Sequence, residues 1–178
     1  GNGENLLKGT KDNTYWFADG DKMGGTAILE KGRIEGTGGA INAWLQIRGR
    51  EQIENLSEIL SNSNGRTYSV SLDMKADRDL EAGIHFSFRN VNSFAGSGTS
   101  DFLIPKEQWK RFSATMKIDE ENKINPDRMI ITILPKADGV IEYRNLKIEE
   151  GTPTAWTPCK DDLINDSGTQ VITAPSYE

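Results

Sequence analysis

The sequence is poor in the side chains that most often bind metals or react covalently. Its 178 residues include one His and one Cys. One Cys cannot form an internal disulfide, and a zinc site built from several His and Cys ligands is excluded. A Cys–His catalytic pair would have to join His85 to Cys159. Because Cys159 lies in a polar segment next to Pro158, an incidental thiol is the simpler interpretation.

The chain also lacks an excess of positive charge and a long apolar run. Its 21 Lys and Arg are outnumbered by 27 Asp and Glu, so the formal net charge is −6. Nucleic-acid binding requires a basic surface, and we therefore expect no nucleic-acid partner. No apolar run approaches the roughly 20 residues that span a bilayer, so we expect no membrane partner. No secretory signal is visible at the N-terminus.

Glycine and short alternating segments are abundant instead. The 18 Gly residues favour turns over helices. Apolar and polar residues alternate in 68–75, 84–89 and 112–118, which predicts half-buried β-strands. Segment 129–134 is apolar in both of its alternating rows of side chains, as in a central strand covered on both faces or a strand whose outer face meets a loop. The inward rows predict a core of Val70, Leu72, Met74, Ile84, Phe86, Phe88, Phe112, Met116, Ile118, Ile131 and Ile133.

The remaining pattern predicts an all-β fold with one short helix. We expect extended segments at 26–30, 40–48, 101–104 and 140–148, a hairpin turn at Asp138-Gly139 and a loop at 96–100. Ile53, Leu56, Ile59 and Leu60 recur at helical spacing, which predicts a short helix near 51–60. Many short strands predict a two-sheet antiparallel β-sandwich. We expect residues 1–162 to form one domain and polar residues 163–178 to form a tail or linker.

Several strings resemble carbohydrate-binding-module jelly rolls. They are Asn5-Leu6-Leu7 followed by Tyr15-Trp16, the strand at 66–77, the Trp109-Lys110-Arg111 entry into the next strand, and a closing string. The closing string comprises 143–151, Ala155-Trp156-Thr157-Pro158 and Asp161-Asp162. It resembles the end of such modules in tail and minor structural proteins of bacteriophages and prophages. The resemblance covers residues 5 to 162 and implies a jelly-roll β-sandwich.

The resemblance also implies a role in adhesion. The implied partners are cell-surface or cell-wall carbohydrate and other tail-protein domains or subunits. The implied location is the virion tail or an extracellular cell surface. Some related modules hold a structural calcium, partly through an Asp in the last strand. Asn145 stands at the matching position here, which puts a calcium site in doubt, and we expect no cofactor.

Sugar recognition needs an outward aromatic ring flanked by polar groups. If every second residue of 41–47 faces the core, the residues between them form an outward-facing row of side chains. The polar residues of strand 84–89 form a second such row. If the two strands share a sheet, the rows line one concave face. The candidate ligand-binding residues are therefore Asn42, Trp44, Gln46, Arg48, His85 and Arg89.

Structural interpretations of these residues stay open. Trp44 could be covered by a loop or by the predicted helix, and His85 could be an ordinary hydrogen-bonded strand residue. Arg48 and Arg89 could be solvated or paired with carboxylates. For Trp16 and Trp156, near the chain ends, we expect a role in holding the termini to the sandwich.

Catalytic motifs are absent from the sequence. There is no Gly-x-Ser-x-Gly elbow and no Gly-rich phosphate loop ending in Lys-Ser or Lys-Thr. The Glu-x-Asp-x-x-Glu pattern of one jelly-roll glycosidase group is also missing. The sequence therefore favours a non-catalytic binding module. The alternatives are a purely structural connector or oligomerisation domain and, less favoured, a glycoside hydrolase or lyase.

Overall fold

The computed structural model describes residues 3–11, 22–23, 26–30, 32–36, 45–48, 52–90, 92–119 and 126–163. Within them lie two short helices, α1 (Leu56–Ser61) and the 3-10 turn η1 (Lys160–Leu163). The strands are β1 (Lys22–Met23), β2 (Thr26–Glu30), β3 (Arg33–Gly36), β4 (Leu45–Arg48), β5 (Thr67–Ala76), β6 (Leu80–Arg89), β7 (Phe94–Ile104), β8 (Lys110–Lys117), β9 (Arg128–Pro135) and β10 (Gly139–Glu150).

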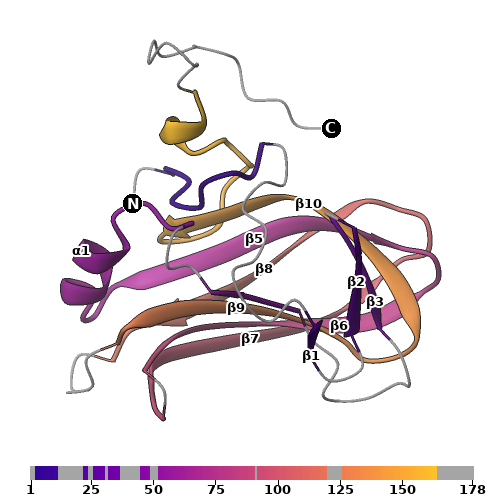
Figure 1. The fold of residues 1–178 in the computed structure, drawn as a ribbon, viewed down its shortest axis with the longest axis horizontal. Coiled ribbons are helices and arrows are strands. Elements are labelled where there is room, and N and C mark those ends of the chain that lie inside the picture. The colour runs from indigo at the N-terminus through magenta and orange to yellow at the C-terminus, as the bar shows by residue number, and fades with distance from the viewer. Residues whose placement is uncertain are drawn as a thin grey trace.

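The strands form two antiparallel sheets packed face to face (Figure 1). The six-stranded sheet has the order β1-β2-β3-β10-β5-β8, and the four-stranded sheet has the order β4-β9-β6-β7. Strands β3 to β10 pair in a nested way, β3 with β10, β4 with β9, β5 with β8 and β6 with β7. Successive pairs alternate between the sheets, which is the strand order of a jelly roll. The predicted fold class is confirmed.

The core lies between the sheets and follows the predicted alternation. Every residue that the sequence predicts for the core is at most 9% exposed. Tyr68 and Phe88 meet across the sheets with ring centroids 5.2 Å apart, and Phe102 stacks on Phe112 at 4.1 Å. β9 is buried on both faces, since Ile130 and Thr132 on its outer side are only 4% and 5% exposed. The prediction of a covered central strand is therefore correct.

The predicted helix begins later than its apolar spacing indicates. α1 starts at Leu56, whereas Ile53 forms an isolated bridge with Leu7. The backbone groups of Gln52 and Glu54 bond to Lys8 and Leu6. Residues 52–54 are therefore extended against the N-terminal segment, and only the second half of the predicted range is helical.

Two predicted connections are wrong. Residues 96–100 form part of β7 rather than a loop. A Cβ on Gly98 would lie 1.9 Å from the Thr115 carbonyl oxygen, so glycine allows the backbones of β7 and β8 to meet where the sandwich closes. Asp138-Gly139 is not a hairpin turn, because β9 and β10 belong to different sheets. It carries the chain from one layer to the other.

The opening and closing strings pack against each other. Asn5 is 2% exposed, and its side chain bonds to backbone groups of Leu7, Leu146, Ile148 and Thr157. Trp156 Nε1 donates to Thr10 Oγ1 at 3.1 Å, which confirms the predicted role of Trp156. Trp16 lies outside the described residues.

Cys159 differs from its predicted setting. Its side chain is fully buried and donates to Glu54 Oε2 at 3.4 Å. Burial raises the pKa of the thiol to about 12. Cys159 is therefore a packed part of the closing segment, although the residues around it in the sequence are polar. Of residues 163–178, the structure describes only Leu163, so the predicted tail lies outside it.

Candidate functional site

The described residues of the two predicted site rows lie in the four-stranded sheet. β4 and β6 lie in this sheet with β9 between them. The backbone register places Gln46 opposite Thr132, which lies opposite His85. The same register places Arg48 opposite Ile130. The condition that the two strands share one sheet is thus met. Asn42 and Trp44 lie outside the described residues.

The accessible part of this sheet's outer face follows β7, at the edge of the sheet. The centre of the face is closed, since Ser87, Ile130 and Thr132 are 1–5% exposed. Phe94 and Leu103, by contrast, are 43% and 52% exposed. Both pair with outward-facing residues of β6, Phe94 with Arg89 and Leu103 with Glu81. Two exposed apolar side chains therefore stand near opposite ends of one strand.

A polar and aromatic cluster surrounds Phe94, and we call His85, Arg89, Phe94 and Ser97 the Phe94 cluster. The His85 and Phe94 ring centroids are 5.5 Å apart. The Arg89 guanidinium lies 4.5 Å from the centre of the Phe94 ring, a cation–π distance. His85 Nε2 hydrogen-bonds with Ser97 Oγ at 2.7 Å. The cluster presents an aromatic ring beside hydrogen-bonding groups on a rigid strand pair.

The imidazole of His85 is held in its neutral form at pH 7. Partial burial lowers its pKa below 6.5, and the positive charge of Arg89 lowers it further. A neutral imidazole has one N–H donor and one nitrogen acceptor. Depending on its tautomer, His85 Nε2 can therefore donate to or accept from a hydroxyl group, and it pairs in this way with the Ser97 hydroxyl.

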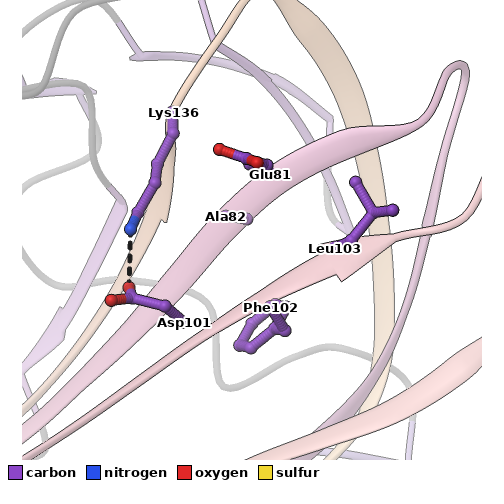
Figure 2. Close-up of a pocket in the computed structure, with 6 residues that line it drawn as sticks. All are labelled: Glu81, Ala82, Asp101, Phe102, Leu103 and Lys136. Carbon is purple, nitrogen blue, oxygen red and sulfur yellow. Dashed lines mark ion pairs between the residues drawn. The ribbon is translucent and has the colours of Figure 1, made fainter.

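A small open pocket occupies the other end of the face (Figure 2). It has a volume of about 240 Å³ and is lined by Glu81, Ala82, Asp101, Phe102, Leu103 and Lys136. Lys136 Nζ forms a 2.7 Å ion pair with Asp101, drawn as the dashed line in Figure 2. A Cβ on Gly83 would lie 2.7 Å from Asp101 Oδ1, so the absence of a side chain makes room for this pair.

Phe94 is the site residue that sequence reasoning missed. It follows a turn and precedes a bulge in the β6–β7 pairing between Phe88 and Arg89. Alternation therefore breaks where Phe94 begins the strand. The available signal was an isolated aromatic residue directly before the Gly-rich run 96–100. The bulge then pairs Phe94 with Arg89 and so brings Phe94 into the row of His85 and Arg89.

Trp109 lies on the opposite face of the molecule, outside the core. The guanidinium of Arg144 and the ammonium of Lys75 lie 4.0 and 5.2 Å from its ring centre. Arg144 and Arg111 both pair with Asp73, whose side chain is 4% exposed. Asn145 donates to the same carboxylate at 2.9 Å. This arrangement is a paired network that covers the six-stranded sheet.

The described residues contain no group of three or more His, Cys, Asp or Glu side chains that could hold a metal ion. Among the same residues, no helix has the length and apolar character needed to cross a membrane.

Comparison with known proteins gives structural matches alone. No family model and no curated protein sequence matches the chain. Among solved structures, a family 4 carbohydrate-binding module shows 11% identity and a TM-score of 0.49, with 75% of this chain and all of the module covered. The xylan-binding CBM22-1 domain from Paenibacillus barcinonensis shows 10% identity and a TM-score of 0.49, with 85% and 97% covered.

Enzymes also occur among the similar structures. The cyclase Fisc from Fischerella sp. TAU shows 10% identity and a TM-score of 0.40, with 51% of this chain and 52% of the cyclase covered. The structural neighbours thus include carbohydrate-binding modules and a catalytic protein. The jelly-roll assignment rests on the nested strand order, and the function has to be argued from the site.

Proposed function

We propose that this chain is a non-catalytic carbohydrate-binding module whose ligand contacts the Phe94 cluster. The observation that carries the proposal is the 43% exposed ring of Phe94 beside His85 and Arg89. Sugars present C–H groups that pack on aromatic faces and hydroxyls that need fixed polar partners. His85, Ser97 and Arg89 supply those partners around one ring.

Binding at a single copy of this site is expected to be weak. The face is open, so it buries only part of a hydrated sugar, and the cost of association consumes much of the interaction energy. Several copies acting together raise the overall affinity. A multivalent display is therefore the suitable test format.

A glycan array with the multivalent chain tests this proposal. We expect binding to at least one surface or cell-wall glycan, weakened about three- to tenfold per site by Phe94→Ala. Leu103→Ala is the matched control, because it removes an exposed apolar side chain from the same strand without removing an aromatic face. Absence of binding to every glycan by the multivalent chain would contradict the proposal.

We expect no turnover of the bound glycan. The absence of catalytic motifs supports this part of the proposal. Incubation of the chain with each bound glycan should release neither new reducing ends nor unsaturated sugar products. Stoichiometric excess of either product over protein would favour a hydrolase or lyase instead.

The phage or prophage tail setting is supported by the string from 143 to 162. Its resemblance to tail proteins extends over residues that form one packed unit with the N-terminal segment, through Asn5 and Trp156. Antibodies against the chain should label the tails of particles whose genome encodes it, as seen by electron microscopy. Labelled capsids with unlabelled tails would reject this setting.

A structural role is the second candidate. The exposure of both Phe94 and Leu103 on an edge strand favours contact with another protein surface. If this role holds, Leu103→Asp should shift the protein to a smaller species in sedimentation velocity. If the carbohydrate proposal holds alone, the sedimentation coefficient should not change.

A further inference from the structure

A second polar groove lies beside α1, away from the Phe94 cluster. It has a volume of about 380 Å³ and is lined by Leu6, Asn55, Glu58, Ile59, Asn62 and Arg66. This volume falls within the range of about 300–1,000 Å³ that is typical of small-molecule sites. Four of its side chains are polar and two are aliphatic. The groove therefore offers both polar and aliphatic side chains to a ligand.

One wall is formed by α1 and the two residues that flank it. Glu58 and Ile59 lie within the helix, Asn55 directly precedes it and Asn62 directly follows it. The other wall is formed by Leu6 and Arg66.

Backbone hydrogen bonds hold both walls in place. Glu54 N donates to Leu6 O at 2.7 Å, which fixes the N-terminal segment beside the start of α1. Arg66 N donates to Ser63 O at 2.9 Å, and Arg66 O accepts from Ile118 N at 2.9 Å. The groove is thus pre-formed, which lowers the entropic cost of binding.

Asn55 has an unusual conformation for its position. Its φ is 56° and its side chain makes no capping hydrogen bond to the helix. Asn before a helix ordinarily stabilises it by such a bond, and Gly would adopt this φ with less strain. Strained residues that persist often serve a site. Here the retained side chain lines the groove.

The donor and acceptor pattern selects the ligand. Glu58 only accepts, Arg66 only donates, and Asn62 Nδ2 is engaged with Glu58 O at 3.3 Å, so Asn62 Oδ1 is the atom available to accept from a ligand. A hydroxyl group can donate to one partner and accept from another. An anion would be attracted by Arg66 but repelled by Glu58, and a cation would meet the reverse, whereas a neutral hydroxyl can bond to both side chains. We propose that the groove binds one neutral sugar unit, with its C–H groups on Leu6 and Ile59.

Chemical-shift mapping by NMR tests this site without reference to Phe94. The probes are glucose, galactose, N-acetylglucosamine and glucuronate, each titrated into the full chain. We expect saturable shifts of the Asn55 and Asn62 side-chain amides with at least one neutral sugar. Glucuronate should bind no more tightly than glucose, because repulsion by Glu58 opposes the attraction of its carboxylate to Arg66.

Two variants on the same helix sharpen the test. Glu58→Ala should weaken binding about tenfold or more, because it removes a charged hydrogen-bond partner. Ser57→Ala, whose side chain is exposed and does not line the groove, should leave the affinity unchanged. No saturable shift in α1, an unchanged affinity in Glu58→Ala, or tighter binding of glucuronate than of glucose would overturn the proposal. None of these results bears on the Phe94 cluster, which Phe94→Ala tests separately.

Discussion

At the scale of single residues, buried polar groups hold the chain ends to the sandwich. Asn5 Oδ1 accepts from the backbone N–H groups of Leu7 and Ile148 at 3.0 and 3.1 Å. Its Nδ2 donates to the carbonyl oxygens of Leu146 and Thr157 at 3.0 and 2.8 Å. One amide therefore satisfies main-chain groups from both ends of the domain.

Replacing Asn5 by Ala should lower the free energy of unfolding by about 2 kcal/mol or more, because buried backbone groups lose their partners. Denaturant unfolding followed by fluorescence measures the change. Asn92→Ala, with an exposed side chain, should cost less than about 0.5 kcal/mol. Equal effects of the two substitutions would argue against the clamp.

The single His gives a clean pH prediction. Burial and then Arg89 lower the pKa of His85 in the folded state below its ordinary value of 6.5, so the unfolded chain takes up a proton more readily. Stability therefore falls as the pH is lowered through 6.5. The imidazole signal in NMR should titrate with a midpoint below 6.5, and His85→Gln should remove this part of the pH dependence. A titration midpoint above 6.5 would contradict this prediction.

The single Cys gives a prediction on reactivity. A fully buried thiol with a pKa of about 12 is almost wholly protonated at pH 8, and the thiolate is the reactive form. We expect Ellman's reagent to react slowly with the native protein. After the protein is unfolded in guanidinium, the reagent should detect one equivalent of thiol. Rapid reaction of the native protein at pH 8 would show that the closing segment is not packed over Cys159.

The sequence predicted some residues of the Phe94 cluster and missed Phe94 itself, for a physical reason. His85 and Arg89 were found because strict alternation on β6 places them opposite Phe86 and Phe88. Phe94 was missed because the bulge near Arg89 interrupts the period of two that the argument needs. The sequence also contains no local signal that β6 and β4 lie in the same sheet with β9 between them.

At the scale of elements, the closure between β7 and β8 depends on glycine. A Cβ on Gly98 would come within 1.9 Å of Thr115 O and 2.7 Å of its carbonyl carbon. Gly98→Ala must therefore push the two strands apart, and we expect a loss of at least about 1–3 kcal/mol in unfolding free energy. Thermal and denaturant unfolding measure it.

Thr99→Ala is the control for that substitution. Thr99 is exposed on the same strand, so its replacement should change stability by no more than about 0.5 kcal/mol. If Gly98→Ala were as mild as Thr99→Ala, the close approach of β7 to β8 would not exist in solution.

The elements themselves were predictable where one face is buried. β5, β6 and β8 follow from alternation, and β9 from its doubly apolar pattern. Long-range pairing explains the errors. Residues 52–54 have helical apolar spacing but pair with the N-terminal segment, and residues 96–100 look like a loop because close strand packing requires glycine.

At the scale of the whole molecule, the nested pairing brings distant segments together. β3 pairs with β10, and the N-terminal segment packs on the closing string. The opening and closing strings are therefore the two ends of one structural unit, whereas ligand contacts are expected on β6 and β7.

The most direct measurement is a chemical-shift map of the chain with the glycan that binds best on the array. If the account is correct, saturable shifts concentrate on Phe94, His85 and Ser97 and disappear in Phe94→Ala. Shifts confined to the outer face of the six-stranded sheet, or an unchanged map in Phe94→Ala, would contradict it.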